Sequence, residues 1–351
     1  MPKDCSCQSG NRRLALYFPT RRSDDLEYAI QSFGWETDPD SGAYVAGIGP
    51  AHRFSTLAQL ANFFRALEPE AWHEIRAAWL ENGCVTDGAS PEPRPLPEMA
   101  PTADTPLLEI LENGGIETHY QPIFRIDDLS VWGYECLMRA RTDDDAMLSP
   151  ADLLAWAKQE NLTFMLDRAC RETHVCNAAG ADVPENVHFL INFLPTAIYE
   201  PAVCLRSTFN AVRRCGIEPQ RVTFEVVETE EVRDSAKLRE ILDAYRDAGF
   251  GVALDDLGSG HSGLLLLADL SPDLLKIDRE LVSRVHESSI HRAICQAMVS
   301  VGEAEGKTVL AEGIETKEQF TVLREMGVEL AQGFLLGKPA PEPVSQPLVT
   351  P

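Results

Sequence analysis

Two adjacent carboxylates, Asp255 and Asp256, come directly after the apolar run FGVAL and shortly before the glycine-rich segment GSGHSG. The apolar run predicts a buried strand. Two carboxylates at its end repel each other and lose hydration on burial, so they need a positive charge nearby. A divalent metal ion is the most direct source of that charge.

Other apolar runs also end in ionisable or amide side chains, namely Glu135, Asn192, Glu225, Glu228, Lys276, Glu312 and Gln332. If these runs are parallel strands of one barrel, their carboxyl ends meet on the face that carries active sites. Converging carboxylates cannot all stay unpaired. Because the set offers oxygen ligands and no histidine, it favours Mg²⁺ or Mn²⁺ over zinc. Two such ions would activate water and neutralise a phosphoryl group.

The residues from about 107 to 345 alternate between strand-like and helical patterns. The strand-like runs are GIETHYQPIF, VWGYECLMRA, VHFLINFL, RVTFEVVE, GVALDDL, LLKID, TVLAEGI and LAQGFLLG. The helical patterns span residues 151–178, 201–215, 235–248, 279–304 and 317–326. This alternation predicts an α/β fold, and the strand count favours a TIM-like (β/α)₈ barrel. Only IDDLS separates the first two runs, so we expect one antiparallel strand.

A proline-rich segment, residues 87–106, predicts an extended linker between two domains. The front domain, residues 1–86, has a strand-like RLALYFP and a helical pattern over residues 57–80, which together predict a small α+β fold. We expect this domain to be regulatory, although nothing in it indicates which signal it senses. Cys5 and Cys7 have no second pair of ligands at metal-site spacing, so their role stays open.

Composition excludes several classes of protein. The chain has 31 Lys+Arg against 55 Asp+Glu, a formal net charge of -24, which disfavours binding to a nucleic-acid polymer. No apolar run approaches the roughly 18 residues that a membrane span needs. The nine cysteines are odd in number and follow no signal peptide, so we expect reduced thiols in a cytoplasmic protein.

The ordered motifs resemble those of the EAL domain, a bacterial phosphodiesterase family that opens cyclic di-GMP to linear pGpG. The resemblance covers residues of about 110 to 341. Glu135-Cys136-Leu137 stands at the name-giving triplet, with Arg139 after it. The later motifs follow in the family's order as INFLP, FEVVE, DDLGSGHSG, LKIDR, AEGIE and AQGFLLGKP.

The resemblance implies a role for each matching residue. One ion would be held by Glu135, Asn192, Glu225 and Asp255, and Asp255 would bridge to a second ion held with Asp256 and Glu312. The catalytic residues would be Lys276, which orients the attacking water, with Glu312 and Gln332. Substrate would contact Gln121, Leu137, Arg139, Asp255 and Pro339. Glu228 would stabilise the glycine-rich loop, and the barrel would form a homodimer.

The sequence departs from the family at a few positions, among them Leu257 for a phenylalanine and Gly263 for a serine. These changes leave open the rate and the regulation of the reaction. Two alternatives to a cyclic di-GMP phosphodiesterase remain: a receptor or protein-interaction module with weak catalysis, and a metal-dependent phosphatase or nuclease with another substrate. Because the matching ligands and the lysine are all present, the sequence favours the phosphodiesterase.

Overall fold

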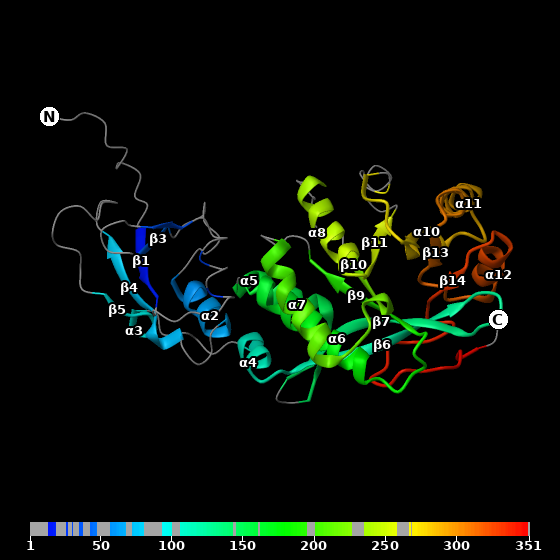
Figure 1. Ribbon diagram of the computed structural model, residues 1–351. Coiled ribbons are helices and arrows are strands. Elements are labelled where there is room, and N and C mark those ends of the chain that lie inside the picture. The colour runs from blue at the N-terminus through cyan, green and yellow to red at the C-terminus, as the bar shows by residue number, and fades with distance from the viewer. Residues whose placement is uncertain are drawn as a thin grey trace. The chain divides into compact units, whose positions relative to one another are not determined.

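Figure 1 shows the computed structural model of the chain. The structure describes residues 13–18, 26, 30, 35–37, 43–47, 57–67, 72–80, 93–99, 106–142, 145–160, 162–194, 201–226, 235–257, 267 and 269–349. Within these ranges, residues 13, 36–37, 46–47, 57–59, 62, 66, 79–80, 97, 201–204, 235–237 and 255–257 are described by their backbone alone. The chain divides into two compact units, residues 1–115 with 140–166 and residues 116–139 with 167–351.

The first unit contains a five-stranded sheet in the order β2-β3-β1-β4-β5. Its strands are antiparallel neighbours: β1 (Arg13–Tyr17), β2 (Glu36–Thr37), β3 (Tyr44–Gly47), β4 (Arg76–Leu80) and β5 (Arg94–Pro95). The accompanying helices are α2 (Leu57–Leu67), η1 (Trp72–Glu74), α3 (Leu96–Met99), α4 (Pro106–Glu112) and α5 (Pro150–Glu160). Buried Leu14, Leu16, Phe63 and Phe64 form part of its core.

Two sequence expectations differ from this unit. The helix predicted over residues 57–80 ends at Leu67, and the second half of that range forms η1 and β4. Residues 94–99, inside the predicted linker, form β5 and α3, and β5 pairs with β4. The boundaries drawn at residues 86, 106 and 345 stay a prediction.

The second sheet is a closed barrel of eight strands in the described residues. The order β6-β14-β13-β12-β11-β10-β9-β7 is closed by pairing of β6 with β7, and the short β8 (Met147–Leu148) extends β7. The barrel strands are β6 (Ile116–Arg125), β7 (Val131–Arg141), β9 (His188–Phe193), β10 (Val222–Val226), β11 (Gly251–Leu257), β12 (Leu274–Ile277), β13 (Thr308–Ala311) and β14 (Leu330–Ala331). From β7 through β14 the barrel neighbours are parallel, whereas β6 runs antiparallel to β14. The predicted TIM-like barrel with one antiparallel strand is confirmed.

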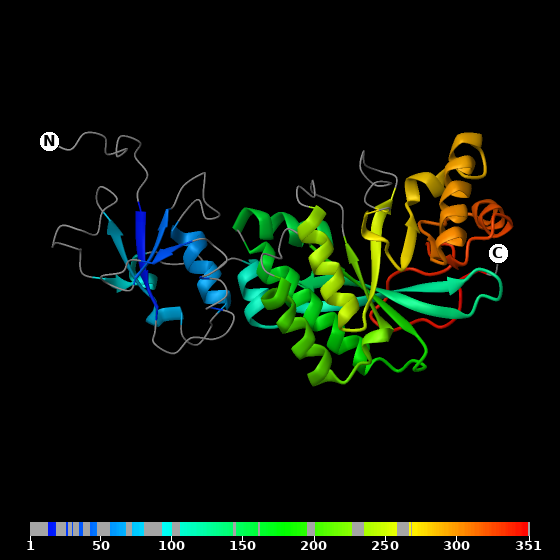
Figure 2. The same cartoon turned by 45° about the horizontal axis from the view of Figure 1, so that its top comes forward.

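Helices cover the outside of this barrel. They are α6 (Thr163–Gly180), α7 (Pro201–Cys215), α8 (Ser235–Asp247), α10 (Arg279–Ser283), α11 (Ser289–Glu305) and α12 (Lys317–Glu325). Figure 2 shows α6, α7 and α8 side by side along the barrel wall. The two longest predicted helices are each divided in the structure: α5 and α6 take the place of residues 151–178, and α10 and α11 take the place of residues 279–304.

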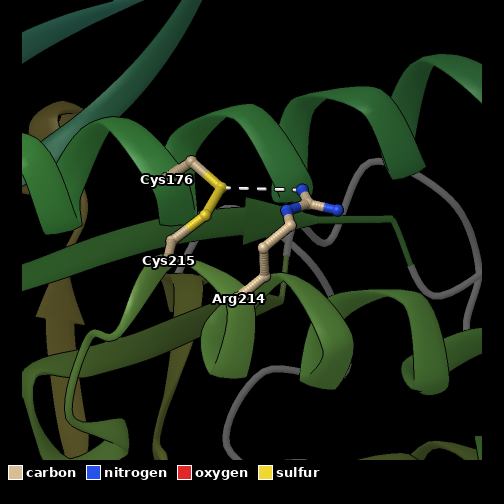
Figure 3. The surroundings of a disulfide bond; sticks show 3 residues. All are labelled: Cys176, Arg214 and Cys215. Atoms are coloured by element: carbon tan, nitrogen blue, oxygen red, sulfur yellow. Dashed lines mark hydrogen bonds between the residues drawn. A yellow bond between two sulfur atoms is a disulfide. The ribbon is translucent and has the colours of Figure 1, made fainter.

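A disulfide joins two of the outer helices. Cys176 on α6 and Cys215 at the end of α7 are bonded (Figure 3), so the expectation of reduced thiols is wrong for this pair. Spacing along the sequence could not reveal it, because nine cysteines allow many pairings. Cys136, Cys170 and Cys295 are buried thiols. Within the described residues, no helix combines the length and the apolar character needed to cross a bilayer.

Candidate active site

A layer of apolar side chains fills the barrel interior just below its polar end. Six strands contribute one buried residue each, namely Ile123, Leu190, Ala253, Leu274, Leu310 and Leu330. Alternate residues of a strand point to the same side, so the residue two positions later on each parallel strand faces the same interior. Among the residues whose side chains are described, those positions hold Asn192, Lys276, Glu312 and Gln332. A polar layer therefore lies next to the apolar layer inside the barrel, toward the carboxyl ends of the parallel strands.

Glu135 on β7 is the acceptor at the centre of one polar cluster. Asn192 Nδ2 donates to Glu135 Oε1 at 3.1 Å, and Gln332 Nε2 donates to Glu135 Oε2 at 2.7 Å. The carboxylate is buried, with 8% relative exposure. Amide oxygens Asn192 Oδ1 and Gln332 Oε1 are also buried and accept no hydrogen bond from the described residues. The amide groups therefore orient the carboxylate while leaving their own oxygens available.

Lys276 on β12 lies between two carboxylates. Its Nζ is 3.1 Å from Glu225 Oε1 and 2.6 Å from Glu312 Oε1. Lys276 and Glu225 are almost fully buried, whereas the Glu312 side chain is 17% exposed. Because Glu225 pairs in register with Asn192 on β9, this cluster adjoins the one around Glu135. A positive charge within the acidic layer is thus supplied by the chain itself.

The aspartate pair lies at an irregularity in β11. Pairing with β12 moves from Leu254–Leu275 to Leu257–Ile277, so β11 carries one more residue than its neighbour across Asp255 and Asp256. Bulges of this kind are common beside active sites. Only the backbone of the two aspartates is described. Glu228, which the sequence predicts to stabilise the glycine-rich loop, lies outside the described residues. Gly263, the loop position where the family has a serine, also lies outside them.

Four of the predicted substrate-binding residues lie on β6, on β7 and in the C-terminal segment. Gln121 is buried, and its Nε2 donates to the carbonyl of Gly337 at 3.4 Å. Leu137, Arg139 and Pro339 are half-buried. Arg139 Nη1 donates to the carbonyl of Met138 at 2.7 Å. Burial lowers the pKa of the Arg139 guanidinium, and the nearby Glu135 carboxylate acts in the opposite direction.

Cys136 follows Glu135 on the opposite side of β7 and is fully buried. Burial raises the pKa of its thiol well above the ordinary value, and Glu135 and Glu225 raise it further. Its sulfur therefore stays protonated at neutral pH and behaves as a small apolar group.

A buried ion pair supports the strand that carries Asn192. Arg171 Nε donates to Asp167 Oδ2 at 2.9 Å, and Asp167 Oδ1 accepts from the backbone N–H of Leu194 at 2.8 Å. Arg171 also donates to Thr208 on α7. The sequence interpretation did not single out this pair. The signal was present in Asp and Arg four residues apart on α6, a spacing that lets their side chains meet.

The polar layer presents oxygen atoms of the kind that hard cations prefer. The described side chains offer carboxylates of Glu135, Glu225 and Glu312 and the amide oxygens of Asn192 and Gln332, which suits Mg²⁺ or Mn²⁺. Among the residues whose side chains the structure describes, no three His, Cys, Asp or Glu side chains lie close enough together to hold an ion. The oxygen-only donor set and the two buried amide oxygens that lack a donor fit a hard divalent ion.

The EAL domain family matches residues 105–339 of the chain. The bifunctional diguanylate cyclase/cyclic di-GMP phosphodiesterase MucR of Pseudomonas aeruginosa is 32% identical over 240 residues, which cover 67% of this chain and 34% of MucR. The probable cyclic di-GMP phosphodiesterase PdeG of Escherichia coli is 30% identical over 243 residues, covering 68% of this chain and 47% of PdeG. The chain thus spans a third to a half of the length of these relatives.

Solved structures show the same similarity. A standalone EAL protein from Vibrio cholerae, bound to c-di-GMP, superposes with a TM-score of 0.59 at 31% identity, covering 66% of this chain and 95% of that one. The phosphodiesterase part of PaMucR in complex with c-di-GMP gives a TM-score of 0.57 at 31% identity, with coverages of 67% and 97%. Both matches cover about two thirds of this chain.

Proposed function

The chain belongs to the EAL domain family, and on that premise we propose that it hydrolyses cyclic di-GMP to linear pGpG with the help of two Mg²⁺ or Mn²⁺ ions. The observation that carries the proposal is the polar layer at the barrel end, where Glu135, Asn192 and Gln332 adjoin Lys276 with Glu225 and Glu312. Relatives named as cyclic di-GMP phosphodiesterases support the choice of substrate.

We propose that Glu135, Asn192, Glu225, Asp255, Asp256 and Glu312 hold the ions, with Asp255 shared between them. When bound, such ions lower the pKa of a water molecule and offset negative charge at phosphorus. Gln332 keeps the Glu135 carboxylate in one orientation through its 2.7 Å hydrogen bond. Lys276 donates a hydrogen bond to the attacking water from its position between two carboxylates.

In the proposed reaction, the water oxygen forms a bond to phosphorus while the P–O3′ bond breaks. The product keeps a 5′-phosphate and gains a 3′-hydroxyl. Arg139 binds a substrate phosphate, because its guanidinium is a planar donor of hydrogen bonds. Gln121, Leu137 and Pro339 seat the rest of the dinucleotide, and Glu228 stabilises the loop that follows Asp256.

Two further proposals concern the protein around the site. We expect the barrel to form a homodimer, as the family resemblance implies. We also propose that the residues before the barrel regulate its activity, because their five-stranded sheet contributes none of the proposed site residues.

The test is a chromatogram of products after incubating the full chain with cyclic di-GMP and Mg²⁺, Mn²⁺ or Ca²⁺. We expect pGpG with Mg²⁺ and Mn²⁺ and poor turnover with Ca²⁺, which is larger and less demanding of geometry. Asp255→Asn should abolish the product. Tight binding of cyclic di-GMP without turnover in any metal would show a receptor and would refute the hydrolase proposal.

A further inference from the structure

The disulfide between α6 and α7 lies outside the polar layer of the barrel. The Cα atoms of Cys176 and Cys215 are 5.2 Å apart, within the range that a disulfide spans without backbone movement. Both residues are half-buried, so solvent reaches this part of the surface. An oxidant or a thiol can therefore approach the bond from outside.

A cation lies beside one of the two sulfur atoms. Arg214 Nη2 donates to Cys176 Sγ at 3.7 Å, and Figure 3 shows the guanidinium directed at this sulfur. Arg214 is exposed and comes directly before Cys215 on α7. A neighbouring positive charge stabilises a thiolate, which is the reactive form of cysteine. When the bond is open, Cys176 is thus the cysteine that Arg214 activates.

Cys176 also lines a groove of about 530 Å³ on the barrel surface. The groove is formed by Thr118 and Tyr120 of β6, the end of α6 and the C-terminal segment, and it includes the exposed carboxylates of Asp182 and Glu342. These carboxylates favour a ligand that carries ammonium groups. A small molecule in the groove would therefore lie beside Cys176.

The contact between α6 and α7 does not depend on the disulfide alone. Buried Arg171 of α6 donates to Thr208 of α7, and the Asp167–Arg171 ion pair anchors it. The helices therefore remain joined by buried polar contacts when the sulfur–sulfur bond opens. This arrangement permits a bond that opens and closes without loss of the fold.

We propose that Cys176 and Cys215 form a reversible thiol–disulfide exchange site, in which Cys176 is the reacting thiol and the adjoining groove admits a small, ammonium-bearing disulfide or thiol. The site does not depend on the hydrolysis proposed above. It differs from the buried thiols among the described residues, Cys136, Cys170 and Cys295, whose pKa values burial raises.

The exchange runs in two steps. The Cys176 thiolate attacks one sulfur of the small disulfide, whose sulfur–sulfur bond breaks, and one small thiol leaves with a proton. The Cys215 thiolate then attacks Cys176 Sγ of the mixed disulfide and releases the second small thiol, which also takes a proton. Two electrons pass from the two cysteines to the small disulfide, which becomes two thiols.

The test exposes the reduced full chain to cystamine, a disulfide with two ammonium groups, and maps each cysteine by mass spectrometry of peptides after an acid quench. We expect the mixed disulfide at Cys176 first, then the Cys176–Cys215 bond, and reversal on adding cysteamine. In Cys215→Ser the mixed disulfide at Cys176 should accumulate. Cys136, Cys170 and Cys295 serve as internal controls and should remain thiols.

Arg214 variants separate activation from simple accessibility. Arg214→Gln should slow modification of Cys176 about threefold at pH 7 and move its pH profile to higher pH, whereas Arg214→Lys should keep the original profile. Thiols that persist at both positions in excess cystamine would overturn the proposal. Modification of Cys215 before Cys176, or an unmoved pH profile in Arg214→Gln, would overturn the assigned role of Cys176.

Discussion

Gln332 donates a 2.7 Å hydrogen bond to Glu135 across 197 residues of sequence. The contact joins β7, near the start of the barrel, to the residue that follows β14 at its end. Asn192 donates to the other oxygen of the same carboxylate. With an amide on each oxygen, Glu135 has one defined orientation at the polar end of the barrel.

Replacement of Glu135 by alanine should lower the rate of cyclic di-GMP hydrolysis by about 10²–10³-fold, because both amide donors lose their acceptor and the site loses a carboxylate. Gln332→Ala removes only a supporting contact and should cost about 10–100-fold. Product chromatography at saturating Mg²⁺ measures both. Glu329→Ala is a matched control, since Glu329 is exposed just before β14. Equal rates in Glu135→Ala and the control would remove Glu135 from the site.

Replacement of Lys276 by methionine should lower the free energy of unfolding by about 3–5 kcal/mol in a metal-free buffer, because it leaves buried carboxylate charge without its cation. Added Mg²⁺ should restore more stability to this variant than to the parent chain. Urea denaturation with EDTA or with Mg²⁺ measures the difference.

Lys307→Met provides the comparison for Lys276. The Lys307 ammonium lies 3.8 Å from Asp273 at a partly exposed position, and such pairs contribute about 0–1 kcal/mol. If Lys276→Met lowers the free energy of unfolding no more than Lys307→Met does, the Lys276 ammonium does not offset the charge of the buried carboxylates.

Arg171→Met should also cost about 3–5 kcal/mol, because Asp167 then keeps a buried charge without its partner. Burial already raises the pKa of the Asp167 carboxyl, and Arg171 acts against this rise. In the double variant Asp167→Asn/Arg171→Met the charge is gone, while the Asn oxygen can still accept from Leu194. We expect the double variant to be more stable than Arg171→Met in urea denaturation. A purely additive result would show that the two side chains do not act as a pair.

The buried imidazole of His174 makes stability depend on pH. Burial lowers its pKa from 6.5 to about 3. The unfolded chain therefore takes up a proton here below about pH 6.5, whereas the folded chain stays neutral until about pH 3. The neutral imidazole's contribution to the free energy of unfolding is fully present above pH 6.5. It should decrease by about 1.4 kcal/mol per pH unit as the pH falls toward 3.

In His174→Gln, the free energy of unfolding should fall less steeply with decreasing pH between 6.5 and 4.5. The difference in slope, measured by urea denaturation, should correspond to the uptake of about one proton on unfolding. Thr118 Oγ1 lies 2.7 Å from the imidazole Nδ1 and also accepts from Asn177 Nδ2. The exposed His73 supplies the comparison variant His73→Gln. An unchanged slope in His174→Gln would assign the pH dependence to other groups.

Reduction of the Cys176–Cys215 disulfide should lower the free energy of unfolding by about 4 kcal/mol, because the bond closes a loop across a sequence separation of 39. Urea denaturation with and without a phosphine reductant measures the change. The double variant Cys176→Ser/Cys215→Ser should show no effect of the reductant. A reductant effect of equal size in that variant would point to a different cysteine.

The sequence predicted all eight barrel strands, because most of them have a short apolar run that ends in a polar residue. Helix divisions were harder to predict. The break before α11 has a local cause, since the Ser288 side chain accepts from the N–H of His291 and caps a new helix. The helix predicted over residues 57–80 is too long because the apolar spacing continues past Leu67. Pro69, two residues after the end of α2, disfavours continuation of the helix.

Much of the candidate site was also within reach of the sequence, since strand ends of a parallel barrel meet on one face. Lys276 was expected to orient water, and its two carboxylate neighbours emerged only from strand register. The roles of all the predicted site residues stay predictions, and for Asp255, Asp256 and Glu228 the structure describes no side chain. The disulfide and the Asp167–Arg171 pair depend on how helices pack, which a local pattern does not contain.

The antiparallel β6 has a consequence for biosynthesis. It is the first barrel strand to be made, yet its edges are satisfied only by β7 and by β14, the last, and Tyr120 further pairs with Ala340. A nascent chain therefore carries an open sheet edge until β14 has been translated, and such edges invite aggregation. Truncation before Leu330 would leave this edge open permanently, so such fragments should need a chaperone to remain monomeric.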